Sequence, residues 1–148
     1  MAAFETEVVI DGQQEKVFDV VTTTGHWPHW AQLARAVAGV TERPFQLGDP
    51  IYEFCRTPTG PQEVLWHITE YDRPRHAKLV AEDGTTITYI FTGQGDDTSY
   101  RRVFELGPVL GAQEPLPYTV DTARSENARV KALVENILWR EEKDRNLP

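Results

Sequence analysis

The sequence has 148 residues and a mass of 16.8 kDa, the size of one domain, and we expect residues 1–148 to fold as a single domain. No apolar run approaches the roughly 20 residues that a membrane span needs. The formal net charge is −8, which argues against electrostatic binding of nucleic acid or of an anionic membrane. The N-terminus lacks the pattern of a signal peptide and the single cysteine, Cys55, excludes an internal disulfide, so we expect a cytoplasmic protein.

The first third of the chain predicts two strands and, between them, two short helices. FETEVVI alternates as a strand does, and the apolar residues of QQEKVFDVV recur at helical spacing. Proline at position 28 suits the first turn of a second short helix. The expected elements are a strand over Phe4–Ile10, a helix over 13–21, a helix that begins near Pro28 and carries Trp30 and Leu33, and a strand from near Gly39 to Arg43.

The middle of the chain predicts a meander of short strands, because β-rich runs alternate with turn residues such as Gly60-Pro61 and Asp83-Gly84. The expected strands cover Pro50–Thr57, Gln62–Tyr71, His76–Glu82, Thr85–Gly93 and Thr98–Gly107. A long helix follows over 121–145, because apolar residues from Val130 to Leu138 form one stripe and charges fill the other face. The segment 108–121 has no assignment.

A seven-stranded antiparallel sheet cannot bury its apolar face alone, and the order of elements favours an α+β, helix-grip fold. In it the curved sheet wraps around the long C-terminal helix, with two short helices after the first strand. The stretches VVIDGQQEKVFDVV, HWPHW, LGDPIYEF, VLWHITEYDRPR and YIFTGQGDDTSYRRVFEL resemble the START-like, Bet v 1-like (SRPBCC) superfamily. Within it, the chain is similar to bacterial proteins of the polyketide cyclase/dehydrase type over about residues 4 to 140.

The resemblance implies a deep, largely apolar cavity between the sheet and the long helix. Relatives use this cavity to hold lipids, sterols, polyketides or plant metabolites, and some cyclise and aromatise a polyketide chain there. No motif of the aromatase/cyclase chemistry maps onto this sequence residue by residue. The resemblance therefore indicates a fold and leaves the activity open.

The stretch TGHWPHW concentrates two histidines and two tryptophans in seven residues. His26 and His29 would share one face of a helix, but a zinc site needs a third ligand, and nothing fixes His67, His76, Cys55 or a carboxylate nearby. We therefore expect no metal. We favour a packed corner in which Trp27 and Trp30 lie under the turn and the histidines face solvent. In the alternative, Trp30 reaches the cavity mouth, because relatives place this corner beside the entrance.

Arg102 lies in an otherwise apolar row, because alternation puts it on one side of its strand with Tyr100, Phe104 and Leu106. A buried arginine without a partner would cost several kcal/mol, so it should meet a carboxylate or an oxygen of a ligand. Two other interpretations remain open. Arg102 either faces solvent at a bulge or sheet edge, or pairs with Glu53 or Glu70.

Strand alternation also selects candidate cavity residues, although plain core packing is an alternative for each aromatic one. The candidate ligand-binding residues are Trp30, Tyr52, Phe54, Trp66, Ile68, Tyr89, Phe91, Arg102 and Phe104. A tyrosine hydroxyl such as that of Tyr89 can orient a carbonyl or, assisted by Arg102, donate a proton to an enolate. His67 is a third candidate for acid–base chemistry.

Two functions fit these observations. The first is the binding of a small hydrophobic molecule with a polar end, lipid-, polyketide- or isoprenoid-like, in the internal cavity. The second is a metal-independent polyketide aromatase/cyclase or dehydratase that acts in the same cavity, with no cofactor and no assigned catalytic residue. No phosphate loop, Ser/His/Asp set or Cys-x-x-Cys pair stands out. Binding of a protein partner by the outer sheet face would be favoured if side chains filled the cavity.

Overall fold

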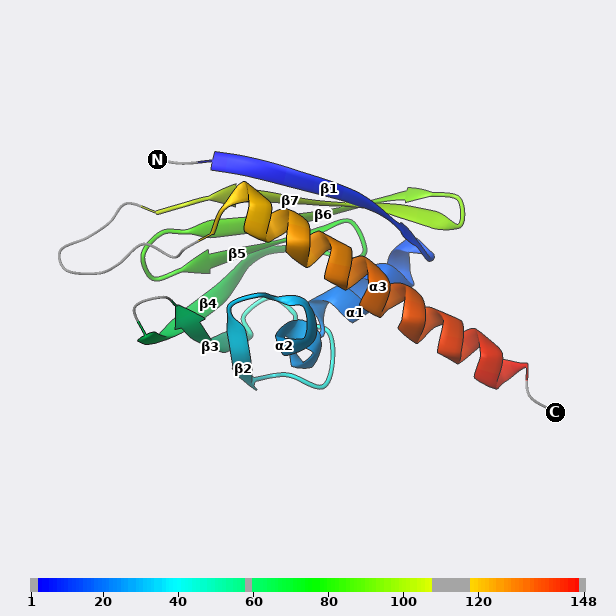
Figure 1. The fold of residues 1–148 in the computed structure, drawn as a ribbon, viewed down its shortest axis with the longest axis horizontal. Helices are drawn as coiled ribbons and strands as arrows, with labels where there is room; N and C mark the ends of the chain where they lie inside the picture. The colour runs from blue at the N-terminus through cyan, green and yellow to red at the C-terminus, as the bar shows by residue number, and fades with distance from the viewer. Residues whose placement is uncertain (1–2, 58–59, 108–117, 147–148) are drawn as a thin grey trace.

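The computed structural model describes residues 3–57, 60–107 and 118–146, and it has the expected helix-grip fold (Figure 1). The strands are β1 (Ala3–Asp11), β2 (Ala34–Gly39), β3 (Pro50–Thr57), β4 (Gly60–Asp72), β5 (His76–Ala81), β6 (Thr86–Gln94) and β7 (Asp97–Glu105). The helices are α1 (Gln14–Thr22), a short 3-10 turn η1 (Thr24–His26), α2 (Trp27–Trp30) and α3 (Val120–Arg145). The predicted fold class is confirmed.

The seven strands form one antiparallel sheet in the order β1-β7-β6-β5-β4-β3-β2. Neighbours in the middle of the chain are joined as hairpins, and the first strand closes the far edge by pairing with the last, with Phe4 opposite Phe104. The β6–β7 hairpin turns within two residues, because Gln94 pairs with Asp97 and Gly95 has a positive φ of 71°. This register sets which side chains of β6 and β7 point toward the helices.

One strand and one helix differ from the sequence-based expectation. The helix α2 ends at Trp30, because Ala31 takes an extended conformation, so Leu33 is outside it. Strand β2 follows at once, over Ala34–Gly39, where we expected a strand from Gly39 to Arg43. Gly39 has a φ of 102° and ends the strand instead of starting it. The tryptophan corner is therefore tied directly to the edge strand.

The long helix α3 lies along the concave face of the sheet and then continues beyond it (Figure 1). Thr119 caps its first turn, because the Thr119 side chain accepts a hydrogen bond from the backbone N–H of Thr122 at 3.1 Å. The helix buries Ala123, Val130 and Val134. Leu133, Ile137 and Leu138 are partly buried, and the described residues from Trp139 onward are exposed. Within the residues that the structure describes, none of the helices is long and apolar enough to cross a membrane.

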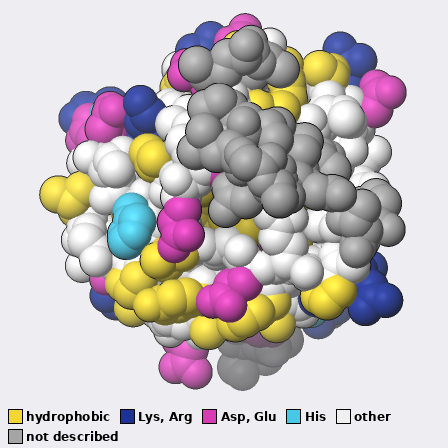
Figure 2. Space-filling view, turned by 90° about the vertical axis from the view of Figure 1, so that its left-hand side faces the viewer, with side chains coloured by type: hydrophobic (Ala, Val, Ile, Leu, Met, Phe, Trp, Pro, Cys, Tyr) yellow, Lys and Arg dark blue, Asp and Glu magenta, His cyan; other side chains and the backbone are white. Residues whose placement is uncertain are grey.

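Figure 2 shows the face at the left-hand end of the molecule in Figure 1, where acidic and hydrophobic side chains stand side by side. Basic side chains lie toward the periphery of this face. Buried hydrophobic residues of the sheet, the short helices and α3 form one core cluster.

Candidate functional site

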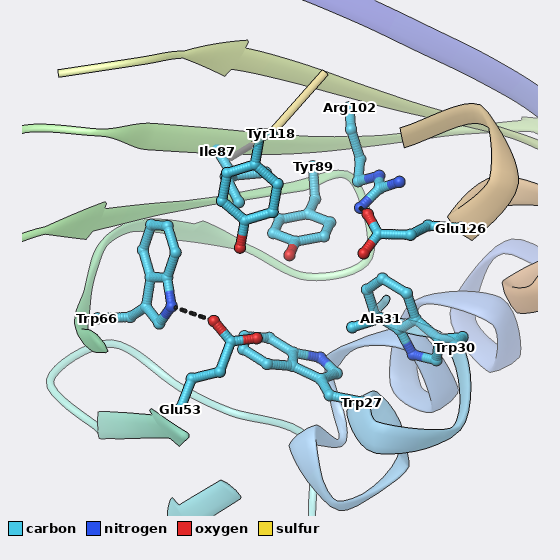
Figure 3. Close-up of a pocket in the computed structure, with 10 residues that line it drawn as sticks. All are labelled: Trp27, Trp30, Ala31, Glu53, Trp66, Ile87, Tyr89, Arg102, Tyr118 and Glu126. Atoms are coloured by element: carbon cyan, nitrogen blue, oxygen red, sulfur yellow. Dashed lines mark hydrogen bonds and ion pairs between the residues drawn. The ribbon is translucent and has the colours of Figure 1, made fainter. Parts of the chain in front are cut away.

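The candidate site is a pocket between the concave face of the sheet, the α2 corner and the first turns of α3 (Figure 3). It is lined by Trp27, Trp30, Ala31, Glu53, Trp66, Ile87, Tyr89, Arg102, Tyr118 and Glu126. The space between these side chains is about 10 Å³, close to what one water molecule needs. The resemblance implied a deep, largely apolar cavity; among the described residues, this pocket is lined by aromatic rings and by three charged side chains, and residues 108–117, which precede Tyr118, lie outside the described residues.

Glu53 is the buried acid of this pocket, with only 3% of its surface exposed. It points inward because β3 alternates, with Ile51, Glu53 and Cys55 buried on the same side. The Trp66 indole N–H donates a hydrogen bond to the Glu53 carboxyl at 3.1 Å. Among the described residues, none of the ion pairs includes Glu53. Burial raises the pKa of Glu53 to about 7, although hydrogen bonds from Trp66 and Cys55 lower it.

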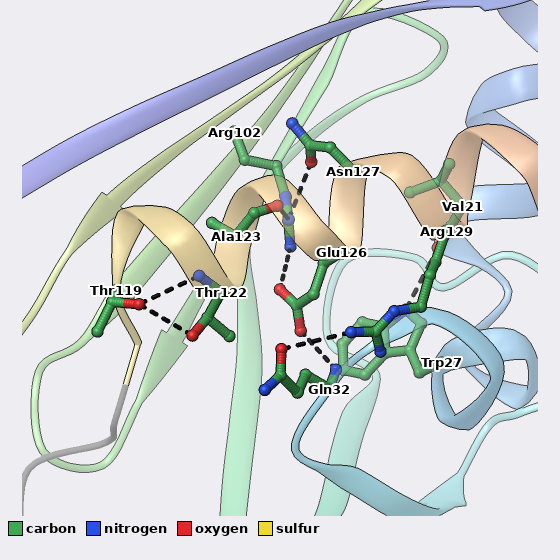
Figure 4. Close-up of polar contacts among 10 residues, drawn as sticks. All are labelled: Val21, Trp27, Gln32, Arg102, Thr119, Thr122, Ala123, Glu126, Asn127 and Arg129. Atoms are coloured by element: carbon green, nitrogen blue, oxygen red, sulfur yellow. Dashed lines mark hydrogen bonds and ion pairs between the residues drawn. The ribbon is translucent and has the colours of Figure 1, made fainter.

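Arg102 is the buried positively charged residue of this pocket, with 2% of its surface exposed. Residues in the first turns of α3 bind its side chain (Figure 4). Its Nη1 donates to Glu126 at 3.1 Å, and its Nη2 donates to the Asn127 side chain at 2.9 Å and to the Ala123 carbonyl at 3.0 Å. The guanidinium also lies 5.4 Å from the centre of the Trp30 ring. Both terminal nitrogens of Arg102 therefore have protein partners.

We expected a buried Arg102 to meet a carboxylate or a ligand oxygen, and it meets a carboxylate, that of Glu126. The alternatives, exposure to solvent and pairing with Glu53 or Glu70, are wrong. Glu70 instead lies 3.6 Å from both His76 and Lys78, on an exposed part of the sheet. The remaining oxygen of Glu126 accepts the backbone N–H of Gln32 at 2.7 Å, so one carboxylate ties β7, α3 and the segment after α2 together. This network explains how an arginine is tolerated in an apolar row.

Two tyrosine hydroxyls point into the same space as the Glu53 carboxyl (Figure 3). Tyr89 comes from β6 and Tyr118 directly precedes α3, and both are buried. Burial raises the pKa of each hydroxyl well above its usual range, so both stay protonated at neutral pH. The pocket thus holds hydroxyl groups that can donate hydrogen bonds, opposite a carboxyl that changes charge near neutral pH.

The structure brings four of the nine candidate ligand-binding residues to the pocket: Trp30, Trp66, Tyr89 and Arg102. Three others are buried in the surrounding core: Ile68, Phe91 and Phe104. Phe104 stacks on Phe4 with ring centres 4.7 Å apart, and Phe91 packs edge-on against Phe18 at 5.0 Å. For these two aromatic residues the contacts are those of core packing.

Tyr52 and Phe54 lie on the wrong face of the sheet to line the pocket, which corrects the expectation for both. They alternate with Ile51 and Glu53, which point inward, and 40% of the Phe54 surface is exposed. The two faces of this strand are both partly apolar, so hydrophobicity alone did not distinguish them. His67, considered for acid–base chemistry, is likewise exposed, on the side of β4 opposite Trp66 and Ile68.

The tryptophan corner is packed as the favoured interpretation of TGHWPHW describes. The Trp27 indole N–H donates to the Val21 carbonyl at 3.2 Å, and its ring meets Trp30 edge-on at 6.2 Å. His29 is exposed and His26 is half-buried. Within residues 3–57, 60–107 and 118–146, no three His, Cys, Asp or Glu side chains are grouped as metal ligands. Trp30 nevertheless also reaches the pocket, so the two non-metal interpretations hold together.

Sequence reasoning missed Glu53, Glu126 and Tyr118 as pocket residues. The sequence contains a pattern that predicts burial of Glu53, because Glu53 lies between two apolar residues on one side of a strand. A pattern also predicts burial of Glu126. It shares one face of the helix with Ala123 and Val130, and this face continues the apolar stripe toward the N-terminus. Tyr118 falls in the segment 108–121, which received no assignment, and residues 108–117 lie outside the described residues.

Comparisons with known proteins give the family and the fold. A family model described as polyketide cyclase / dehydrase and lipid transport matches residues 1–135. The chain belongs to this family. A comparison with curated proteins found no match.

Among solved structures, a START superfamily protein from Mycobacterium smegmatis is similar with a TM-score of 0.70 and 10% identity, over 91% of this chain and 98% of that one. An AHSA1-like protein from Aeromonas hydrophila has a TM-score of 0.64 and 14% identity, over 92% and 94% of the two chains. The di-domain ARO/CYC BexL of the BE-7585A biosynthetic pathway has a TM-score of 0.64 and 19% identity, over 91% of this chain and 47% of that one. At these identities the likeness shows the fold.

Proposed function

We propose that the protein binds a small hydrophobic molecule with a polar end, lipid-, polyketide- or isoprenoid-like, in the pocket between the sheet and α3. The observation that carries the proposal is the Glu53 carboxyl, which is buried against aromatic rings without an ion pair among the described residues. A buried carboxyl of this kind destabilises a fold, and core packing gives no reason to keep it. The Trp30 indole N–H adds a buried donor without a partner among the described residues.

The family supports this choice over partner binding by the outer sheet face. Its description includes lipid transport, and one structural neighbour is an ARO/CYC protein. As the described residues bound it, the pocket has about 10 Å³ of free space, which suits the polar end of a ligand. Drug-sized ligands occupy roughly 300 Å³ or more, so the hydrophobic body of the ligand requires space beyond that volume.

The test is a titration with N-phenyl-1-naphthylamine, a neutral dye whose fluorescence rises in apolar surroundings. We expect saturable binding near the micromolar range, about −8 kcal/mol. Ala31 lines the pocket, so Ala31→Phe should block the dye, whereas Ala132→Phe on the exposed side of α3 should not. Native mass spectrometry of the purified protein identifies any ligand that is carried along. If the dye fails to bind the wild-type chain, or binds Ala31→Phe equally well, the partner-binding alternative replaces this proposal.

A second candidate function is an acid–base enzyme of the cyclase or dehydratase type in the same pocket. It is favoured by the position of the buried Glu53 carboxyl opposite the Tyr89 and Tyr118 hydroxyls; burial raises the pKa of this carboxyl to about 7, which suits a group that takes up and releases a proton at neutral pH. The tyrosine hydroxyls stand where they can stabilise a developing enolate. A turnover assay in which Glu53→Gln loses activity, with a pH profile that bends near 7, would support the enzyme.

A further inference from the structure

The charges that line the pocket do not balance. Two carboxyl groups, Glu53 and Glu126, face it together with one guanidinium, that of Arg102. Arg102 is paired with Glu126, and its other terminal nitrogen is taken up by Asn127 and a backbone carbonyl. When Glu53 is ionised, the pocket therefore carries a net charge of −1, and that charge sits on the acid that has no basic partner among the described residues.

The walls around Glu53 are suited to a cation. Three indole rings and two phenol rings line the pocket: Trp27, Trp30, Trp66, Tyr89 and Tyr118. The faces of such rings attract positive charge, most strongly when water is excluded. The protein already uses this interaction in the same pocket, because the Arg102 guanidinium lies 5.4 Å from the Trp30 ring centre.

We propose that the polar end of the ligand is a protonated amine, which binds the Glu53 carboxylate between these aromatic rings. This inference rests on the proposed function and names its ligand class. An ammonium group is about the size of a water molecule, so it matches the free space of about 10 Å³ in the pocket that Glu53 lines. The sequence favoured a carboxylate or carbonyl ligand held by Arg102, but Glu126 and Asn127 already occupy the terminal nitrogens of that side chain.

The experiment compares three ligands of similar size by calorimetry at pH 8: 2-phenylethylamine, 2-phenylethanol and phenylacetate. The amine should bind about tenfold or more tightly than the alcohol, the scale of a charge-assisted hydrogen bond, and phenylacetate should bind most weakly. Glu53→Gln should abolish the preference for the amine. That variant keeps the oxygen that accepts from Trp66. Glu63→Gln is the matched control, because it removes an exposed carboxylate from the neighbouring strand.

A second readout is the pH dependence of amine binding. The amine requires ionised Glu53, so its affinity should fall about tenfold per pH unit below the pKa of the free carboxyl, while the affinity of the alcohol stays level. The other titratable groups near Glu53 are Cys55 on its own strand, Arg102 on β7, Glu126 on α3, and the two tyrosines, 89 and 118. Burial raises the pKa of the Cys55 thiol and of both tyrosine hydroxyls, and the Arg102 guanidinium keeps its proton, so none of these four groups changes charge between pH 6 and 8.

The outcomes separate the ligand class from the function itself. Equal binding of amine and alcohol, or tighter binding of phenylacetate to the buried N–H groups of Trp30 and Arg102, overturns the amine proposal and leaves the small-molecule function standing. Equal loss of amine affinity in Glu53→Gln and Glu63→Gln overturns it as well. If none of the three ligands and no apolar dye binds the wild-type chain, both proposals fail.

Discussion

At the scale of single residues, Glu53 and Arg102 are both buried in one pocket but are stabilised in different ways. Arg102 has an ion pair, two further hydrogen bonds and aromatic neighbours. Glu53 accepts hydrogen bonds from the Trp66 indole and the Cys55 thiol, and its negative charge is repelled by that of Glu126. The arginine is therefore part of the framework of the fold, whereas the glutamate is the group left available for a ligand.

Arg102→Met should destabilise the protein by about 3 to 5 kcal/mol, because it leaves Glu126 buried without its partner. Denaturant unfolding at neutral pH measures the effect. Arg101→Met is the control, because Arg101 lies on the opposite side of the same strand and should change stability little. Replacing Glu126 by Met as well should recover part of the loss. A loss below about 1 kcal/mol in the single variant would mean that the buried pair is not a framework contact.

Glu53→Gln should become more stable relative to the wild type as the pH rises. The pKa of Glu53 is raised in the folded state, from 4.5 to about 7, so the protonated form contributes stability below pH 4.5 that is lost as the pH rises through 7. The wild type should therefore lose about 3 kcal/mol between pH 4.5 and pH 8 that the Gln variant keeps.

Urea unfolding at pH 5 and pH 8 of the wild type and Glu53→Gln measures this difference, and Glu63→Gln serves as an exposed control. A difference between wild type and Glu53→Gln that is the same at both pH values would show that the Glu53 carboxyl is not perturbed by burial.

The sequence predicted the side of the strand on which Arg102 lies, but not its partner. Alternation along β7 is local, because it depends only on neighbouring positions. The Arg102–Glu126 pair joins residues 24 positions apart, and it depends on how far α3 slides along the sheet and how it rotates. No pattern within either element fixes that geometry, which is why Glu53 and Glu70 were equally reasonable candidates.

At the scale of elements, α3 has a part that packs against the rest of the protein and a C-terminal part that is exposed. The buried positions run from Ala123 through Val130 to Val134, and they end where the helix passes the edge of the sheet. The sequence placed the apolar stripe farther along, from Val130 to Leu138, because hydrophobic residues continue there. Leu133, Ile137 and Leu138 are only partly buried, and Trp139 is 59% exposed with Lys143 over its ring at 5.2 Å.

Val134→Ala should therefore reduce the stability of the fold more than Ile137→Ala does, although it removes fewer atoms. Val134 is fully buried, so the loss should be about 2 kcal/mol, whereas Ile137→Ala should stay below about 1 kcal/mol. Chemical denaturation of the two variants tests the order. The reverse order would mean that the second half of α3 packs against the protein in solution.

The short elements were harder to predict than the long ones, and α2 with β2 shows why. A helix of four residues is too short to show a hydrophobic periodicity, so the sequence did not predict that it ends at Trp30. The following strand is an edge strand with mostly exposed residues, and its alternation is weak. The strands β4, β6 and β7 each have nine or more residues with clear alternation, and these were predicted closely.

At the scale of the whole molecule, the topology was predictable and the cavity was not. A meander of strands with one apolar face needs a cover, and a single long amphipathic helix supplies it, so few arrangements remain. The volume inside depends on which side chains fill the space between sheet and helix. Among the described residues, Trp27, Trp30, Trp66 and Tyr118 line the pocket together with six other residues, and about 10 Å³ is free between the lining side chains. The size of a cavity is a property of that packing and not of the order of elements.

The fold should not need the last residues of α3. The family match ends at residue 135, and the described residues after Arg140 are all exposed. A chain that ends at Arg140 should therefore unfold within about 2 to 4 °C of the full chain in a single transition, because less than about 1 kcal/mol is lost.

A chain that ends at Ser125 lacks Glu126, Val130 and Val134, which leaves Arg102 unpaired and the concave face of the sheet uncovered. It should show no cooperative transition by calorimetry. If the Arg140 chain also lost cooperative unfolding, the last turns of α3 would be part of the folded core, and the exposed position of Trp139 would need another explanation.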